Sequence, residues 1–370
     1  MRLRSEFVQL AQVEGVNFSE LCRRFGVSRK TGYKWLRRYR QEGAEGLADR
    51  SRRPHHSPKR SAAEVEQRVL EVRQEHPAWG GRKIKAYLEQ TQGVQAPSAS
   101  TITAILHRQE QIDAEESLKH RAFQRFEMAH PNELWQMDFK GYFRLEAGGK
   151  CHPLTVLDDY SRFLIGLRAC SDQSHLTVKT QLSELFRQYG LPERMLMDNG
   201  SPWGDDAETH HTVLTVWLMR LGIQVCHSRP YHPQTLGKDE RLHRTLQAEL
   251  LRYLKPDHLA ACQTQFDRWR AVYNAQRPHE ALDLQPPAIR YQPSPRPFPE
   301  VLPPIEYEPQ DLLRCVDVNG RFRFRNRVFR VGKAFRSQIV ALRPQEIDGM
   351  FAVYFCHSKI AEINLREVKP

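Results

Sequence analysis

Apolar residues in the first 110 positions recur every three or four residues, which is the period of an amphipathic helix. The pattern predicts two short helices within 6–25, with Ser19 as the N-cap of the second, and a third helix over 28–40 that its first serine caps. Similar spacing returns in 61–108, where a Gly-Gly turn precedes a short basic helix. The pattern therefore predicts two all-α helix-turn-helix domains, at residues 1–53 and 61–110.

From Asn132 onward, short apolar runs that predict strands alternate with longer runs that have a helical period. Gly190 ends the first of these helices. Strands that alternate with helices favour a mixed sheet with helices packed on it, and we expect this α/β domain to span 125–292. A charged, proline-poor segment at 110–130 predicts a connecting helix before it. The expected strands are 133–143, 151–159, 162–170, 193–200 and 223–230, and the expected helices are 174–190, 212–222, 235–250 and 256–282.

A proline-rich linker at 285–304 separates this domain from a series of short strands in 306–370. Asn319-Gly320 and Asp348-Gly349 supply turns between them, so the pattern predicts a small all-β domain, a β-barrel or a sandwich. The segment 321–331 is expected as one strand, with arginine on one face and phenylalanine on the other. Such a strand fits an edge protected by charge and a DNA-backbone contact equally well.

Charge changes this picture most at the N-terminus. The chain has a formal net charge of +12, and residues 1–60 alone carry fifteen Lys and Arg against six Asp and Glu. This excess indicates a polyanionic partner, and the short turn before 28–40 makes that segment a DNA-recognition helix in preference to a solvated basic face. The second helical domain has nearly balanced charge, so it fits either DNA positioning or a protein partner. The expected DNA contacts are Arg29, Lys30, Lys34, Arg37 and Arg38.

The seven cysteines are scattered and form no C-x-x-C pair, which favours a reducing cytosol over a disulfide framework or a zinc site. No apolar run is long enough to span a bilayer, and the first residues lack the apolar core of a signal peptide. We therefore expect a cytoplasmic protein with no membrane partner.

Three carboxylates occupy positions that suit catalysis. Asp138 lies within the first expected strand, Asp198 ends the fourth, and Glu240 is in the second turn of the helix at 235–250. The carboxyl ends of strands are where ligand sites collect, and oxygen ligands from separate elements are what Mg²⁺ prefers. Two such ions support in-line displacement at a phosphodiester. The alternative for Glu240 is a solvent-exposed charge on a surface helix.

Other charged residues are weaker candidates for the catalytic site. Asp158 and Asp159 are expected to brace a turn, with Arg162 as a local partner. Asp239 precedes Glu240 but lies about 100° away around the helix. The expected phosphate contacts near this site are Lys238 and Arg244, and His232 and Gln234 fit loop shape or DNA contact equally well.

The motifs WQMDF, VLDDYSRF, MDNGSPW, HSRPYHPQTLGKDERLHRTL and YNAQRPHEAL together resemble the catalytic core of DDE transposases of the retroviral-integrase superfamily. The chain is similar to bacterial insertion-sequence transposases, with helix-turn-helix domains before an RNase-H-like core. The resemblance implies that Asp138, Asp198 and Glu240 bind two Mg²⁺ ions, or Mn²⁺ in their place. It also implies strand cleavage to a 3′-hydroxyl, followed by transfer of that strand to target DNA.

The resemblance further implies double-stranded DNA partners, namely terminal inverted repeats and target DNA, and self-association into a synaptic dimer or higher multimer in the nucleoid. One departure is a longer gap before Glu240, which we assign to a polar insertion at 204–211. A DNA-binding regulator that no longer cleaves is the alternative function. A structure-specific nuclease is disfavoured, because it does not need paired reading domains.

Overall fold

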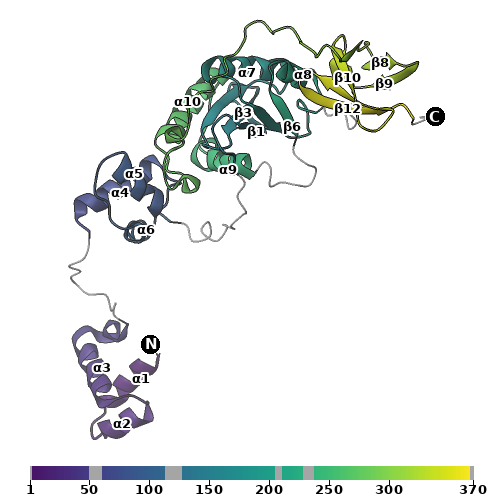
Figure 1. The fold of residues 1–370 in the computed structure, drawn as a ribbon. Coiled ribbons are helices and arrows are strands. Elements are labelled where there is room, and N and C mark those ends of the chain that lie inside the picture. Colours follow the sequence, from purple (N-terminus) through teal and green to yellow (C-terminus); the bar gives the residue numbers. More distant parts are fainter. Residues whose placement is uncertain (1, 50–60, 113–126, 205–210, 228–236, 367–370) are drawn as a thin grey trace. The chain divides into compact units, whose positions relative to one another are not determined.

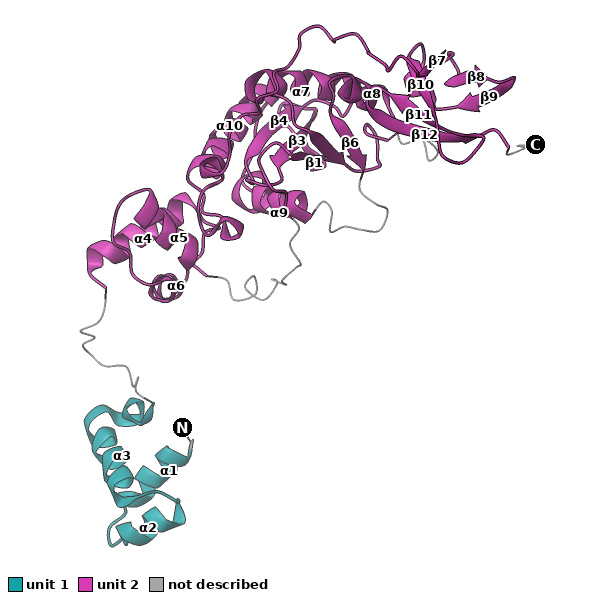
Figure 2. Ribbon diagram, viewed as in Figure 1, with its two compact units in different colours: residues 1–60 teal, residues 61–370 magenta. Residues whose placement is uncertain are grey.

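The computed structural model describes residues 2–49, 61–112, 127–204, 211–227 and 237–366. The chain divides into two compact units, 1–60 and 61–370 (Figure 2). Most of the expected connecting helix, most of the insertion, and the loop residues His232 and Gln234 lie outside the described residues. Within the described part of the chain, every helix is too short or too polar to cross a membrane.

The first unit is a three-helix domain built around Phe7, which is fully buried among aromatic and aliphatic side chains. Ser28 caps the third helix as expected, since its hydroxyl accepts the Thr31 N–H. Ser19 was the wrong cap for the second helix. That helix begins two residues earlier than expected, so the Asn17 side chain accepts the N–H groups of Ser19 and Glu20. The helices are α1 (Arg2–Ala11), α2 (Phe18–Arg24) and α3 (Arg29–Glu42), followed by a 3₁₀ turn at Gly43–Leu47.

The second unit begins with another three-helix domain: α4 (Ala63–Glu75), α5 (Gly81–Gln90) and α6 (Ala99–Arg108). Trp79, Ile84 and Ile102 are buried at its centre. The Gly-Gly turn starts α5 very close to α6. A Cβ added at Gly81 would lie 2.5 Å from the Ala99 carbonyl oxygen, whereas a Cβ at Gly80 would meet nothing within 4 Å.

The α/β domain contains a six-stranded sheet in the order β2-β3-β1-β5-β6, with β4 also paired to β3 (Figure 1). β3 is antiparallel to β1, β2 and β4, while β5 is parallel to β1 and β6. The sheet is therefore mixed, as expected. Its strands are β1 (Leu134–Phe139), β2 (Phe143–Arg144), β3 (Lys150–Asp158), β4 (Leu164–Cys170), β5 (Arg194–Met197) and β6 (Gln224–His227).

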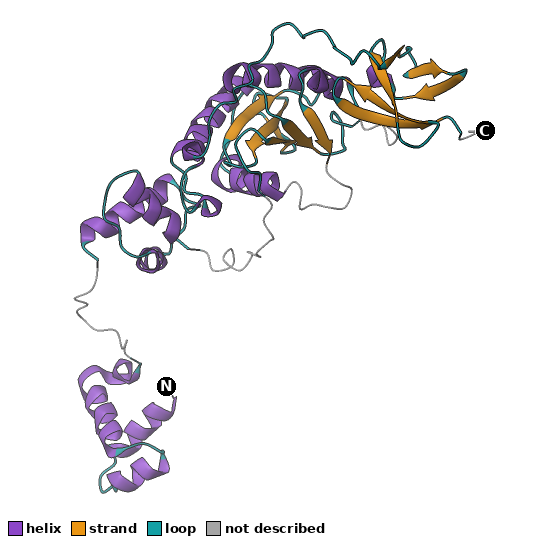
Figure 3. Ribbon diagram, in the orientation of Figure 1, coloured by secondary structure: helices purple, strands orange, loops and turns teal. Residues whose placement is uncertain are grey.

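Helices cover both faces of this sheet (Figure 3). One apolar core joins Met137 and Val156 of the strands to α7 (His175–Tyr189) and α8 (Val213–Arg220). The other core joins strand residues to Leu242 and Leu246 of α9 (Gly237–Leu246) and to α10 (Leu259–Ala275). Because side chains alternate along a strand, Gln136 and Asp138 of β1 face the α9 side.

The C-terminal region is all β, with one core shared by a four-stranded antiparallel sheet in the order β12-β11-β10-β7 and a separate hairpin, β8–β9. The expected single strand at 321–331 was wrong. Arg325 and Asn326 both adopt positive φ, and this two-residue turn folds the segment back on itself. The strands are β7 (Leu312–Cys315), β8 (Arg321–Phe324), β9 (Arg327–Arg330), β10 (Ile339–Pro344), β11 (Met350–Phe355) and β12 (Ser358–Asn364).

The contact between α5 and α6 makes a stability prediction. Gly81→Ala places a methyl group against the backbone of α6, so we expect it to destabilise the second helical domain by about 1–3 kcal/mol. Gly80→Ala is the matched control, because its backbone angles suit alanine and the added methyl group meets open space. Hydrogen exchange across 63–108 measures the difference. Equal protection in the two variants would contradict the packing described above.

Candidate active site

Asp138 and Asp198 come together through the parallel pairing of β1 and β5. Gln136 pairs with Leu196 in this register, so two residues further on Asp138 is aligned with Asp198, just past the end of β5. Both carboxylates therefore lie at the carboxyl edge of two neighbouring parallel strands. Asp198 also shapes its own turn, since its side chain accepts the Gly200 N–H at 3.0 Å.

Helix α9 brings two further carboxylates to the same edge. Glu240 is exposed in the first turn of the helix. The preceding residue, Asp239, is only 1% exposed and turns toward the sheet. Sequence reasoning set Asp239 aside because it lies about 100° from Glu240 around the helix. The two side chains do diverge as consecutive residues of a helix must, but Asp239 is the one that faces the sheet and Glu240 is the one that is exposed.

A small polar layer joins α9 to the sheet beneath Asp138. The Thr155 hydroxyl, opposite Asp138 in the β1–β3 register, lies 3.2 Å from Asp239 Oδ1 and 2.9 Å from His243 Nε2. The other ring nitrogen of His243 is 3.9 Å from Asp138 Oδ2. Asp138, Asp239 and His243 thus form a close group with possible metal-ligand atoms. The Thr155 hydroxyl already forms hydrogen bonds with Asp239 and His243.

The electrostatics of the group follow from burial and like charge. Burial, with the charges of Asp198 and Glu240, raises the pKa of Asp138 to about 6, against the Phe139 N–H and Lys140, which lower it. Burial also raises the pKa of Asp239 well above its usual range, with Asp138 adding to the effect. Burial lowers the pKa of His243 to about 4, so its contacts at neutral pH are those of a neutral imidazole.

These residues fit a divalent cation. Asp138, Asp198 and Glu240 offer hard oxygen ligands from three separate elements, and each of the last two raises the pKa of Asp138 by its charge. A cation between them would relieve this repulsion. Asp239 and His243 lie next to Asp138 on its buried side, where neutral or hydrogen-bonded groups can orient its carboxylate.

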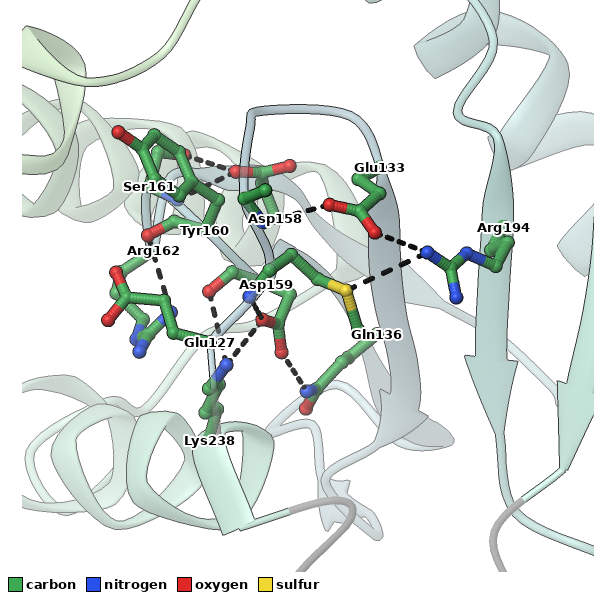
Figure 4. A network of polar contacts seen from close by, with 12 residues as sticks. Glu127, Glu133, Gln136, Asp158, Asp159, Tyr160, Ser161, Arg162, Arg194 and Lys238 are labelled. Carbon is green, nitrogen blue, oxygen red and sulfur yellow. Dashed lines mark hydrogen bonds and ion pairs between the residues drawn. The ribbon is translucent and has the colours of Figure 1, made fainter. Parts of the chain in front are cut away.

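A second polar network lies beside the site (Figure 4). Asp158 braces the turn as expected, accepting the backbone N–H and the hydroxyl of Ser161. Asp159 does something different: it is fully buried, accepts a hydrogen bond from Gln136, and forms an ion pair with Lys238 of α9. Sequence reasoning missed this role, because it depends on how α9 docks on the sheet.

The expected DNA contacts have different surroundings. Arg29, Lys30, Lys34 and Arg37 are exposed along α3, and Arg38 is half-buried. Arg244 is exposed on α9. The ammonium group of Lys238 is directed at Asp159, with 16% of the side chain exposed. A DNA contact by any of these residues stays a prediction.

Comparison with known proteins supports this organisation. A helix-turn-helix domain model matches 3–55 and a homeodomain-like domain model matches 31–106. Integrase core domain models match 128–233 and 221–287. A model of the C-terminal domain of IS481 family transposases matches 311–370. The fold class expected from the sequence is thus confirmed: helical N-terminal region, integrase-like α/β core and all-β C-terminal region.

Similar proteins include the transposase for transposon Tn552 of Staphylococcus aureus, which is 25% identical over 263 residues, 64% of this chain and 53% of the relative. An uncharacterized 31.7 kDa protein of insertion element IS407 from Burkholderia multivorans is 25% identical over 282 residues, 74% of this chain and 91% of the relative. A Gag-Pol polyprotein of baboon endogenous virus is 28% identical over 190 residues, 49% of this chain and 10% of the relative. The chain thus spans about half of the Tn552 protein and a tenth of the viral polyprotein.

Among solved structures, a simian T-cell lymphotropic virus intasome in complex with PP2A regulatory subunit B56 gamma aligns with 82% of this chain and 99% of its own matched chain. The identity is 14% and the TM-score is 0.39.

The raised pKa of Asp138 predicts a stabilising substitution. Its folded pKa of about 6 lies above the ordinary aspartate pKa of 3.8, so the ionised carboxylate destabilises the fold above pH 6, and the cost vanishes below about pH 4. We expect Asp138→Asn to raise the free energy of unfolding at pH 8 by about 1–2 kcal/mol in EDTA, since partial exposure screens the repulsion. The gain should shrink toward pH 4.

Urea denaturation at pH 8 and at pH 4.5 measures this effect. Glu184→Gln on α7 is the control, because the Glu184 side chain is half exposed and forms an ion pair with Arg168, away from the three carboxylates. If Asp138→Asn and the wild type have equal stability at pH 8, burial and like charge do not destabilise the ionised Asp138 as described.

Proposed function

We propose that this chain, which belongs to the insertion-sequence transposases with an integrase core, cleaves DNA at the ends of its element and joins them to target DNA. The observation that carries the proposal is the gathering of Asp138, Asp198 and Glu240 at one edge of the sheet. Strand exchange at a phosphodiester needs anionic ligands that hold divalent cations beside the scissile phosphate. These three residues supply such ligands.

We assign Asp138, Asp198 and Glu240 as ligands for Mg²⁺, with Mn²⁺ as a substitute and two ions as the expected number. When bound, the ions activate the nucleophile and stabilise the leaving oxygen. The protein's own residues hold the carboxylates in register: β1 carries Asp138, the turn at Gly200 orients Asp198, and α9 carries Glu240. The nucleophiles are water for cleavage and then a DNA 3′-hydroxyl for transfer.

Recognition of the element ends is assigned to the first helical domain. Its third helix is fixed by the Ser28 cap and by packing of Gly32 against Phe7, while its cationic side chains remain exposed. A helix of this kind fits the major groove, with its basic residues on the phosphates and base edges. Two ends must be held at once for transposition, so we propose a dimer or higher multimer as the active form.

Substitution of Glu240 tests the catalytic part of the proposal. Glu240→Gln removes one anionic ligand and keeps the side-chain volume, so we expect at least a 100-fold loss of cleavage and strand transfer, with end binding unchanged. The assay follows nicking and joining, with Mg²⁺ or Mn²⁺, of DNA that carries the ends flanking the gene. Asp198→Asn should behave in the same way.

Glu184→Gln is again the matched control, since it replaces an acid on α7, which packs on the sheet face opposite α9. Tight end binding without cleavage by the wild type, across both metals and at concentrations that support multimers, would favour the non-catalytic regulator. Full activity of Glu240→Gln would remove Glu240 from the site.

Substitution on α3 tests recognition. We expect Lys34→Ala and Arg37→Ala each to weaken binding to the element ends by about 1–3 kcal/mol if they contact bases, or to lower the salt slope by about 0.9 if they contact phosphates. Lys179→Ala on α7 is the control cation. Fluorescence anisotropy at several salt concentrations measures both quantities. Wild-type affinity and slope in both variants would exclude α3 as the reading helix.

A further inference from the structure

The Asp159 carboxylate lies where three parts of the core meet. Its Oδ1 accepts the Gln136 side-chain N–H at 2.8 Å, and its Oδ2 accepts the Met128 backbone N–H at 3.0 Å. The ammonium group of Lys238 bonds to the same Oδ2. Figure 4 shows Gln136 reaching Asp159 from the strand and Lys238 reaching it from the helix. The carboxylate therefore links β1, α9 and the segment that enters the core.

Gln136 and Lys238 are each two residues away in the sequence from a proposed metal ligand. Gln136 precedes Asp138 by two residues and lies on the same face of β1. Lys238 precedes Glu240 by two residues in the first turn of α9. A single buried carboxylate is thus tied to the strand just before one proposed metal ligand and to the helix just before another.

The first turn of α9 depends on such ties for its orientation. The apolar contacts of the helix with the sheet, Leu242 and Leu246, come later in α9, and apolar packing is not directional. In the first turn the inward contacts are polar: Lys238 with Asp159, and Asp239 with Thr155. Each residue turns a helix by 100°, so a modest rotation of this turn would move Glu240 away from Asp138.

Resting on the function proposed above, we propose that Asp159 and Lys238 are positioning residues, whose buried ion pair sets the rotation of α9 that brings Glu240 to Asp138. The ion pair contributes to the orientation of α9 more than to the free energy of unfolding. A buried ion pair is seldom more stabilising than an apolar pair of the same volume, because both charges lose their hydration. Lys238 is then assigned to Asp159 in place of a DNA phosphate, the role expected from the sequence.

The test uses the full-length protein with Lys238→Met, Asp159→Asn and the double variant. Each removes the ion pair with little change in volume. We expect kcat for cleavage of the element ends to fall about 100-fold in each single variant, since a shift of about 1 Å at a catalytic group has this effect. KM for the DNA ends should stay within twofold. The double variant should be no worse than the poorer single variant, because both lose the same contact.

Titration with Mn²⁺, followed by electron paramagnetic resonance without DNA, gives a readout independent of activity. We expect Lys238→Met to weaken Mn²⁺ binding about tenfold, in the same direction as Glu240→Gln. Lys179→Met, an exposed cation on α7, is the control for charge loss and should match the wild type. Thermal unfolding identifies any variant that fails to fold, and Asp159→Asn, which keeps a hydrogen-bonding group, then supplies the measurement for the pair.

Three results would overturn the positioning role. The first is Mn²⁺ affinity and kcat within twofold of the wild type in the folded single variants. The second is a loss of DNA affinity in Lys238→Met with a salt slope lower by about 0.9, which assigns Lys238 to a phosphate. The third is wild-type Mn²⁺ binding by Glu240→Gln, which removes the proposed ligand itself. The first two results contradict the positioning role but leave the proposed function standing. Only the third contradicts Glu240 as a metal ligand, on which the proposed function and the positioning role both depend.

Discussion

Repulsion among carboxylates is the constraint on which the core depends. Asp138 and Asp198 are brought side by side by parallel strand pairing, and α9 adds Glu240 and the buried Asp239. Burial, and then the nearby charges of Asp198 and Glu240, makes the ionised form of Asp138 costly and raises its pKa to about 6. The rest of the core must therefore hold these groups in place by contacts that do not depend on their mutual attraction.

The structure provides these contacts on two levels. Apolar side chains fix where the layers lie: α7 and α8 pack on one face of the sheet, and α9 and α10 on the other. Directional polar contacts then fix how α9 is rotated, through Thr155 beneath Asp239 and Asp159 beside Lys238. A polar layer of this kind costs desolvation energy, but it specifies one orientation where apolar packing alone admits several.

The sequence predicted the parts of this arrangement that follow from local periodicity. Alternation in β1 and the strand end at Asp198 locate two acids before any tertiary contact is known, and the Ser28 and Gly190 caps are confirmed. Features set by tertiary contact or by the choice of turn were missed. The inward orientation of Asp239 depends on how α9 docks on the sheet. The hairpin turn was missed because Arg325 adopts a positive φ there without the glycine that usually marks such a turn. The metal-ligand roles stay predictions, because position alone does not show what a carboxylate binds.

The same repulsion connects cation binding with protonation. A carboxylate whose pKa is about 6 retains a proton over much of the mildly acidic range, and a cation that binds Asp138 must displace this proton. Above pH 6 the Asp138 carboxylate is ionised at a cost to the fold, so a cation that binds there removes a cost that the fold already bears. Below pH 6 part of this cost has been removed by protonation, and less remains to favour the cation. The acids that make the metal-free core less stable at neutral pH thus make it a stronger ligand for cations there.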